Sequence, residues 1–427
     1  MTDAPVTKLT PSDHTYLHLD TGSSPMHWAM LLEISAEGAP LEVGAVRERV
    51  RERSALFELF RLGIDRGRWR RPREVVAEKV EVDSHFAAAG YADAADLRTQ
   101  ITALLETPLP RPQPMWHLTL FTPAGDGAQY FLLRVHHAVS DGIAGAAFAA
   151  LLADGSATEL AEFERFATSP RFRTPEIEPA VLKESKAAFA AQHAAGKTGR
   201  GWPKLTTSGR REYALYSAST RDLRRAATAH GASVHEFLLA AIGRAISIAP
   251  PSAAPAEVVR VTLPVTNDPE FRHTGNAVIV TPINLAGNEP DLDRQIERCK
   301  AELAVVGKRR PELASAAPAT EPGLPWALRR VIGSAAMKHM SPDIHIGVNP
   351  GFSQVRSVLG KPITELTALS PLAGYSFSVT SLILGKRTSF GIVTDPASLP
   401  SGYAETFVEQ FDRVLGEAHS ATAGGNR

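Results

Sequence analysis

Two adjacent histidines, His136 and His137, end an apolar run in the stretch LLRVHHAVSDGIAG (132–145), and Asp141 and Gly142 follow them. A histidine at the end of a strand can act as a general base near neutral pH, removing a proton from an attacking hydroxyl or amine. Asp141 can form a buried ion pair that fixes the loop. Gly142 lets a backbone or a substrate approach closely, and its N–H at the start of a helix suits a developing oxyanion. This pattern indicates a catalytic site with a histidine base.

A metal site and an ordinary pair of core histidines are the alternative interpretations. If residues 129–137 form a strand, successive side chains point to opposite faces of the sheet, so His136 and His137 do not bind one metal together. Zinc needs a third ligand, and no other His, Cys or Asp cluster with ligand spacing occurs. We therefore predict no metal. A core pair without chemistry stays open, although the Asp and Gly that follow favour the catalytic interpretation.

Composition limits the class of protein. The chain has 427 residues, long enough for two domains or one large two-lobed unit, with 44% hydrophobic and 22% charged residues. Its 46 basic residues balance its 46 acidic ones, so nothing indicates binding to nucleic acid. The single cysteine, Cys299, excludes an intrachain disulfide and fits a reducing compartment. No signal-peptide core and no run of about 20 apolar residues is present. We expect a cytoplasmic protein, with peripheral membrane contact left open.

Hydrophobic periodicity predicts a mixture of helices and strands in both halves of the chain. In the first half we expect strands at 26–35, 73–82, 115–121 and 129–135, and helices at 45–60, 95–106 and 142–152. In the second half we expect helices at 219–231, 233–249, 291–306 and 403–418, and strands at 257–265 and 277–285, with two more strands around a Gly-Lys turn within 370–395. Ser233 and Glu236 form a capping-box pattern at the start of one helix.

The domain organisation follows from these elements. We predict an α+β fold with an N-terminal lobe at 1–165, a connection at 166–205 around a helix at 179–195, and a C-terminal lobe at 206–420. The tail at 421–427 is predicted to be disordered.

Several stretches resemble one enzyme family. HHAVSDG resembles the His-His-x-x-x-Asp-Gly (HHxxxDG) motif of the acyl-CoA-dependent acyltransferases, which include chloramphenicol acetyltransferase and the condensation domains of peptide synthetases. LTPSDHTYLHLDTGSSPMHWAMLLEI resembles the N-terminal segment of bacterial wax ester synthase/diacylglycerol acyltransferases (WS/DGAT). PMWHLTLF, TGNAVIVTPINL and LSPLAGYSFSVTSLILGKRTSFGIVTD resemble later segments of that family. The resemblance spans nearly the whole chain.

This resemblance implies two chloramphenicol acetyltransferase-like lobes that form a pseudo-dimer with a tunnel between them. It implies that His137 is the general base and that His136, Asp141 and Gly142 support the motif. Acyl-CoA or an acyl carrier protein would be the co-substrate, a small molecule the acceptor, and no cofactor is implied. We expect a monomer or weak dimer. The residues expected to line the tunnel are Met26, His27, His235, Asn276, Ser378 and Thr380.

The chain also departs from the family pattern. His235 and Glu236 stand where the family usually has Asn-Asp, and Glu236 is also explained by the capping box. The family's Asn-Val-Pro-Gly-Pro stretch is GVNPGFSQ here, and Arg272 is the candidate for an arginine common after the family's Pro-Val-Ser segment. An arginine-rich stretch, RLGIDRGRWRRPREVV (61–76), attracts phosphates or an acidic carrier in one interpretation and is a solvated hairpin in the other.

We therefore predict an acyltransferase that forms an ester from an acyl thioester and an acceptor hydroxyl. The acceptor is a specialised metabolite, or a fatty alcohol or diacylglycerol as in the family. Two alternatives remain: the same fold with other chemistry in a biosynthetic pathway (a hydrolase, a cyclase or an amide-forming condensation), and a non-catalytic binder of an acyl carrier.

Overall fold

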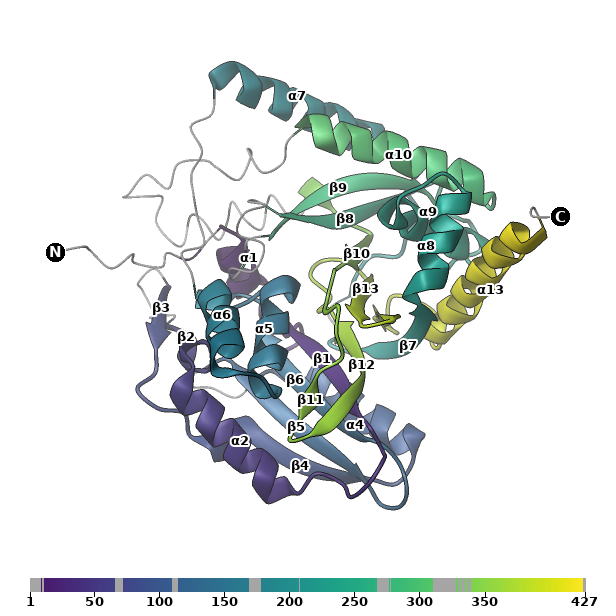
Figure 1. The fold of residues 1–427 in the computed structure, drawn as a ribbon. Coiled ribbons are helices and arrows are strands. Elements are labelled where there is room, and N and C mark those ends of the chain that lie inside the picture. Colours follow the sequence, from purple (N-terminus) through teal and green to yellow (C-terminus); the bar gives the residue numbers. More distant parts are fainter. Residues whose placement is uncertain are drawn as a thin grey trace.

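Two six-stranded sheets form the frame of the molecule, one in each lobe (Figure 1). The computed structural model describes residues 9, 11–65, 72–109, 114–168, 178–206, 208–266, 276, 278–309, 328, 331, 335 and 339–424. The elements up to the end of the connection are α1 (Pro11–Leu19), β1 (His27–Ile34), α2 (Val43–Leu56), the 3₁₀ turn η1 (Glu58–Arg61), β2 (Leu62–Asp65), β3 (Arg73–Val76), α3 (Val82–His85), β4 (Phe86–Tyr91), α4 (Ala94–Glu106), β5 (Trp116–Pro123), β6 (Gln129–His136), α5 (Gly142–Leu152), α6 (Ala157–Thr168) and α7 (Pro179–Ala195).

The elements that follow are β7 (Glu212–Ser219), α8 (Thr220–Ala229), α9 (Val234–Ile248), β8 (Val258–Thr266), β9 (Val278–Ala286), α10 (Leu292–Arg309), β10 (Ile344–Val348), β11 (Ser357–Val358), β12 (Lys361–Leu369), β13 (Phe377–Leu384), β14 (Arg387–Thr394) and α13 (Tyr403–Gly424).

The N-terminal sheet has the strand order β11-β12-β1-β6-β5-β4. Central strands β1 and β6 are antiparallel and place His27 opposite His136, at the end of the sheet where the histidine motif begins. Because side chains alternate along β1, Trp28 and Met30 belong to the core on one face of the sheet, whereas Ala29 belongs to the core on the other face, which α4 covers. The alternation along β1 thus places Trp28 and Met30 on one face of the sheet and Ala29 on the other.

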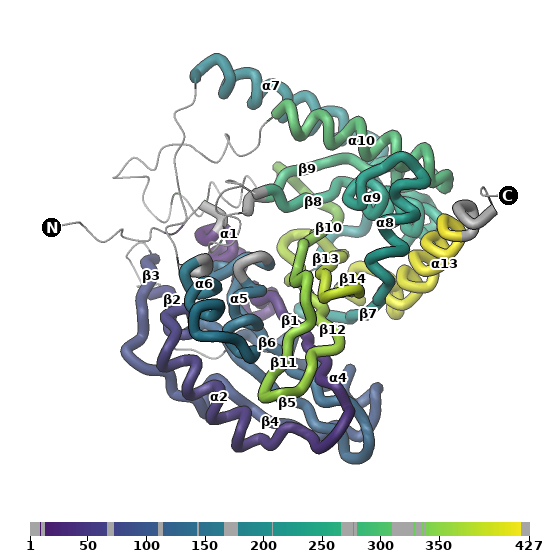
Figure 2. The backbone as a smooth tube through the Cα atoms, viewed as in Figure 1, coloured from purple at the N-terminus to yellow at the C-terminus, as the bar shows by residue number. Residues whose placement is uncertain are grey.

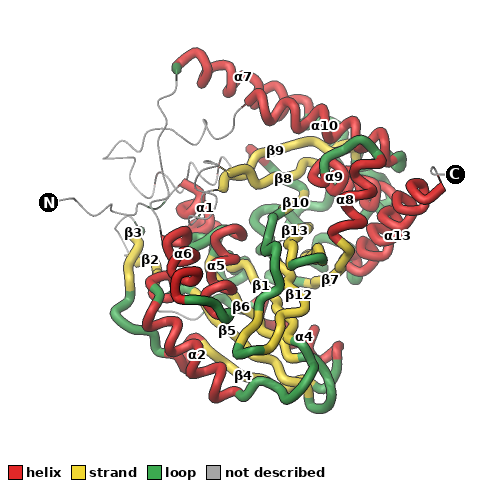
Figure 3. The backbone as a smooth tube through the Cα atoms, in the orientation of Figure 1, coloured by secondary structure: helices red, strands yellow, loops and turns green. Residues whose placement is uncertain are grey.

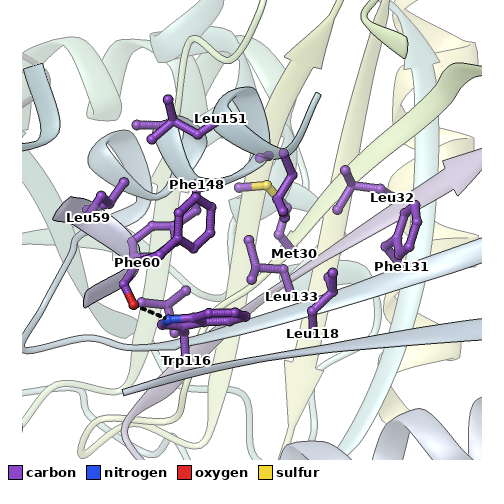
Figure 4. Close-up of a cluster of buried hydrophobic side chains, with 14 of the residues drawn as sticks. Met30, Leu32, Leu59, Phe60, Trp116, Leu118, Phe131, Leu133, Phe148 and Leu151 are labelled. Carbon is purple, nitrogen blue, oxygen red and sulfur yellow. Dashed lines mark hydrogen bonds between the residues drawn. The ribbon is translucent and has the colours of Figure 1, made fainter. Parts of the chain in front are cut away.

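The first of these cores lies between the sheet and helices α2 and α5 (Figure 4). Met30 and Leu133 of the sheet and Phe148 of α5 are almost completely buried there. Trp116 Nε1 donates a hydrogen bond of 2.7 Å to the carbonyl of Phe60, which satisfies the indole N–H inside this apolar region. This packing holds α5 against the sheet, so the N-terminus of α5 has a fixed position.

The C-terminal sheet has the order β7-β14-β13-β10-β8-β9. Its central strand β10 runs parallel to both β8 and β13, while the other neighbouring strands are antiparallel. Helix α10 packs against α7, α9 and β9, and α13 packs against α8, α9 and β7. Figure 2 shows α7 and α10 running side by side along the outer edge of this lobe.

Strands β11 and β12 come late in the sequence but belong to the N-terminal sheet (Figure 3). Strand β12 pairs with β1 and places Leu369 opposite Ala29, and the chain then returns to the C-terminal sheet as β13. The sequence-based lobe 206–420 therefore donates 357–369 to the first sheet, because β1 has a free edge that only a strand distant in sequence fills. The remaining domain boundaries stay predictions.

Most predicted elements agree with the structure, and the helices predicted at 142–152 and 179–195 have those same bounds. The strand predicted at 73–82 is shorter, because β3 ends at Val76 and α3 begins at Val82. The connection predicted at 166–205 includes the last residues of α6. Helix α13 continues to Gly424, so it extends into the tail at 421–427 that was predicted to be disordered.

In the described part of the chain, no single helix combines the length and apolarity of a membrane span. Helices α8 and α9 reach the required length and composition only as a pair, and they are bent by 88°.

Candidate active site

A cavity of about 60 Å³ lies between the two lobes. Its N-terminal wall includes side chains of α1, β1 and the histidine motif, and its C-terminal wall includes residues of β8, β9, β10 and β13. The lining residues that bear on the chemistry are Tyr16, Trp28, His137, Asp141 and Gly142 on one side and Asn276, His345, Gly347, Asn349 and Thr380 on the other. Both lobes therefore contribute polar groups to one cavity.

His137 follows directly after β6 and is held by contacts to both its ring and its backbone. The ring stacks on Tyr16 of α1, with centroids 3.7 Å apart and an interplanar angle of 10°. The backbone N–H donates a hydrogen bond of 2.8 Å to the carbonyl of Met26. The carbonyl of His137 accepts a hydrogen bond from Nδ2 of Asn276. These contacts leave the imidazole little freedom to rotate or shift.

The protonation state of His137 suits a base. Its pKa is lowered to about 3, mainly by burial and also by neighbouring His345 and His136, against the opposing effects of its own carbonyl and Asn276. The ring is therefore neutral near pH 7 and able to accept a proton. Its Nδ1 atom is buried and makes no regular hydrogen bond to a described residue, which leaves Nε2 as the nitrogen that opens on the cavity.

His136 does not line the cavity and is part of a different network. Its Nε2 lies 3.3 Å from Oδ2 of Asp20, and its Nδ1 accepts a hydrogen bond of 3.1 Å from the N–H of Ala138. Oδ1 of Asp20 accepts a hydrogen bond of 3.1 Å from the N–H of Met26, whose carbonyl binds His137. The first histidine of the motif thus fixes the backbone that carries the second.

The Asp-Gly step ends the turn and begins helix α5. The carbonyl of Asp141 accepts a hydrogen bond of 2.7 Å from the N–H of Gly145, and Trp28 Nε1 donates one of 2.9 Å to the carbonyl of Ser140. The Asp141 side chain is buried at the cavity wall.

Burial and the carboxylates of Asp141 and Asp13 raise the pKa of Tyr16, so its phenol stays neutral. A side chain at Gly142 would project toward Asn349, so glycine keeps this end of the cavity open.

Asn276 joins the lobes at the cavity. Its Nδ2 donates a hydrogen bond of 2.6 Å to Oδ1 of Asp13 in α1 and a second one to the carbonyl of His137. Both Asn276 and Asp13 are fully buried. One amide group from the C-terminal half therefore positions both the helix that carries Tyr16 and the histidine on which Tyr16 stacks.

The C-terminal wall adds polar groups that sequence reasoning missed. His345 of β10 and Asn349, which follows β10, both line the cavity. Ser370 was also missed, and its hydroxyl lies 2.7 Å from that of Thr380, which was among the expected residues. The departure at GVNPGFSQ was a signal for this region, because it contains both Gly347 and Asn349.

Of the six residues expected to line the tunnel, Asn276 and Thr380 line this cavity and the other four do not. Met26 is in the core on the α4 side of the sheet, and His27 points to the face of β1 opposite Trp28. Ser378 is fully buried within β13. His235 lies in the first turn of α9, beside a capping box in which Ser233 and Glu236 exchange hydrogen bonds as predicted. The chemical roles assigned from the sequence stay predictions.

Two further expectations fall partly or wholly outside the described residues. Arg272 lies outside them, as do residues 66–71 of the arginine-rich stretch. The flanks of that stretch form a hairpin of β2 and β3, and Arg73 Nε lies 3.2 Å from Oδ2 of Asp65. Among the described residues no group of three or more His, Cys, Asp or Glu side chains is arranged to hold a metal ion.

Comparison with known proteins adds a family match. Residues 9–188 match the family model of the wax ester synthase/diacylglycerol acyltransferase catalytic domain. Residues 9–188 are thus similar to a WS/DGAT catalytic domain. The family resemblance predicted from the motifs is therefore confirmed for this stretch, which contains the whole histidine motif. No curated protein sequence matches the chain.

Solved structures similar to this chain cover nearly all of it, beyond the matched WS/DGAT domain. The wax ester synthase/diacylglycerol acyltransferase from Marinobacter aquaeolei VT8 is 18% identical, with a TM-score of 0.68 over 98% of this chain and 100% of that one. A trichothecene 15-O-acetyltransferase from Fusarium sporotrichioides is 11% identical, with a TM-score of 0.68 over 97% and 94%. The first condensation domain of the CDA synthetase is 18% identical, with a TM-score of 0.65 over 98% and 97%. These likenesses confirm the two-lobed α+β fold, and the family match supports an acyltransferase.

Proposed function

We propose that this protein transfers an acyl group from a thioester to an acceptor hydroxyl, forming an ester, with His137 as the general base. The observation that carries the proposal is a neutral imidazole, held by Tyr16 and Asn276, whose free nitrogen opens on a cavity between two lobes. The donor is acyl-CoA or an acylated carrier protein, and the acceptor is a small molecule. We place the reaction in the cytoplasm.

The proposed step balances without a further reactant. The acceptor oxygen attacks the thioester carbonyl carbon while Nε2 of His137 takes the hydroxyl proton. The new C–O bond forms a tetrahedral intermediate with a negatively charged oxygen. When the C–S bond breaks, the thiolate leaves and receives the proton from His137, which returns to its neutral form.

Donors for the developing oxyanion are present on both walls. The N-terminus of α5 begins at Gly142 on one side, and Asn349 lies on the other with the Ser370–Thr380 hydroxyl pair. Such groups stabilise a transition state when they are fixed before the reaction. The Ser370–Thr380 hydroxyl pair and the backbone hydrogen bond from Asn349 N–H to the carbonyl of Ser381 support fixed positions for these donors.

The test is a free-thiol release assay with a panel of acyl-CoAs from acetyl to palmitoyl, with pooled alcohols and amines, and mass spectrometry of the products. We expect acceptor-dependent thiol release with ester formation, and a loss of turnover of about 10²–10⁴-fold in His137→Ala. His235→Ala is the matched control, because His235 does not line the cavity, and it should retain activity.

The other outcomes distinguish the alternatives. Thiol release that needs no acceptor would indicate a hydrolase, and an amide product would indicate a condensation. No release with any acyl-CoA leads to the same assay with acylated carrier protein, and failure there as well would leave a non-catalytic binder. Full turnover by folded His137→Ala would remove His137 as the base.

A further inference from the structure

A second histidine reaches the cavity from the opposite lobe. His345 lies on β10, where parallel pairing sets it beside Thr262 of β8 and Ser378 of β13. Its ring stacks on Tyr375, with centroids 5.2 Å apart and an interplanar angle of 15°. Each wall of the cavity therefore has one imidazole that is held in place by a tyrosine. The mechanism above uses only His137, so the role of His345 is unassigned.

The contacts of His345 with Thr262 favour a proton on Nδ1 of the imidazole. The hydroxyl of Thr262 donates to the carbonyl of Ile344 at 3.3 Å, which occupies its only hydrogen. Nδ1 of His345 lies 3.1 Å from the same hydroxyl oxygen, and a backbone hydrogen bond with Thr262 stabilises the protonated ring, so we assign the ring proton to Nδ1. Burial lowers the pKa of His345 to about 4, so the ring is neutral near pH 7. Nε2 is then left as an unprotonated hydrogen-bond acceptor.

Nε2 of His345 faces the part of the cavity that Gly347 keeps open. A Cβ atom at Gly347 would lie 3.3 Å from this nitrogen, 3.5 Å from Nδ2 of Asn349 and 3.5 Å from Cγ2 of Thr380. No hydrogen bond occupies Nε2 among the described residues, and Nε2 is not one of the buried unpaired atoms. The nitrogen is thus available to a ligand, beside groups that the proposed reaction uses.

We propose that His345 is a specificity-determining residue that accepts a hydrogen bond from a second polar hydrogen of the acceptor while His137 takes the proton of the reacting hydroxyl. Because both rings line the same cavity, one acceptor molecule can present both polar hydrogens at once. The acceptor class is therefore a diol or amino alcohol, in preference to a simple alkanol, and a 1,2-diol is the smallest probe of it. This inference rests on the proposed function and refines it.

The experiment compares hexane-1,2-diol with 1-hexanol as acceptors, using the acyl-CoA or acylated carrier protein that gives the fastest thiol release. His345→Phe keeps a ring against Tyr375 but removes the acceptor nitrogen. His345→Gln keeps an acceptor atom near the position of Nε2. Thr262→Val removes the hydroxyl that fixes the tautomer and leaves His345 in place.

For the wild type we expect kcat/KM to be higher for the diol than for the alkanol by roughly 10- to 100-fold, the effect of one buried hydrogen bond. His345→Phe should remove this preference by lowering kcat/KM for the diol alone, with an unchanged KM for the donor. His345→Gln should retain part of the preference, and Thr262→Val should weaken it. Thermal unfolding checks that each variant is folded.

Equal kcat/KM values for the diol and the alkanol in the wild type would overturn the inference and leave the proposed function intact. An equal loss of kcat/KM for both acceptors in folded His345→Phe would have the same meaning. A wild type that transfers to no acceptor from either donor would overturn the proposed function itself, and the inference with it. The two failures are distinguishable. Failure of the inference changes the ratio of the transfer rates to the diol and the alkanol, whereas failure of the proposed function means that neither acceptor is acylated.

Discussion

The ring of Tyr16 covers one face of the His137 ring at a centroid distance of 3.7 Å, almost parallel to it. Tyr16 belongs to α1, an N-terminal helix that Asn276 of the other lobe holds in place through Asp13. The orientation of the proposed base therefore depends on three segments that are far apart in the sequence.

Replacing Tyr16 tests whether stacking positions the base. In Tyr16→Ala the imidazole loses the surface against which it packs, and we expect kcat to fall by about 10- to 100-fold, the scale of a small misplacement of a catalytic group. Tyr16→Phe keeps the stack and should stay within a few-fold of wild type. An equal loss in both variants would show that the phenol hydroxyl, not the ring, is what matters.

Asn276 should be important for stability as well as for rate. Asn276→Ala removes one buried donor from both Asp13 and the carbonyl of His137, so we expect the free energy of unfolding to fall by about 1–3 kcal/mol. Asn276→Asp should lower the free energy of unfolding further, because it places a second carboxylate beside buried Asp13. Urea unfolding measures both variants, and Asn288→Ala, at an exposed turn, is the control. Asn276→Asp as stable as the wild type would argue against this bridge.

The buried histidines predict how stability depends on pH. Burial lowers the pKa of His137 to about 3 and those of His345 and His117 to about 4, and it lowers the pKa of His27 well below its usual value. Between these values and about 6.5 the unfolded chain binds more protons than the folded protein, so stability rises with pH there and is lost as pH falls.

This contribution is complete above pH ~6.5, and each such histidine changes stability by at most about 1.4 kcal/mol per pH unit below it. Urea unfolding at intervals from pH 4.5 to 8 should show the slope, and His345→Phe should make it shallower. A stability that does not change between pH 5 and 7 would contradict neutral, buried histidines in the folded state.

Gly145 should tolerate no side chain, because a Cβ atom there would lie 2.5 Å from Cζ2 of Trp28. Trp28 binds the carbonyl of Ser140 within the motif turn, so Gly145→Ala should displace the turn and lower both thermal stability and turnover. Gly416→Ala is the matched control in an exposed part of α13, where nothing lies within 4 Å, and it should stabilise the protein by up to about 1 kcal/mol. Unchanged turnover in Gly145→Ala would show that the turn adjusts freely.

Local patterns sufficed for the elements around the motif. Helix α5 was predictable because Gly142 follows a strand and a turn, and an unbroken apolar run continues from it. The capping box at Ser233 was predictable because it needs only two residues three positions apart. Features of this kind depend on neighbours in the sequence, so sequence alone reveals them.

The missed residues depend on contacts between distant strands. The segment IHIGV of β10 reads as an ordinary strand, and His345 reaches the cavity only because β8 and β13 lie on either side of it. For His27, the alternation of β1 decides the outcome: Trp28 and Met30 line the cavity, so the histidine between Met26 and Trp28 faces away. Neither the parallel neighbours nor the side of the sheet on which the cavity lies is encoded locally.

The exchange of β11 and β12 into the first sheet has a consequence for biosynthesis of the chain. During translation β6 is synthesised soon after β1, whereas residues 361–369, the partner of the other edge of β1, are synthesised near the end of the chain. Exposed strand edges are templates for aggregation, and long-range pairings form slowly. A nascent or truncated chain that ends before β12 therefore lacks the strand that covers this edge, and neither lobe is a unit that can be exchanged with another protein by cutting the sequence once.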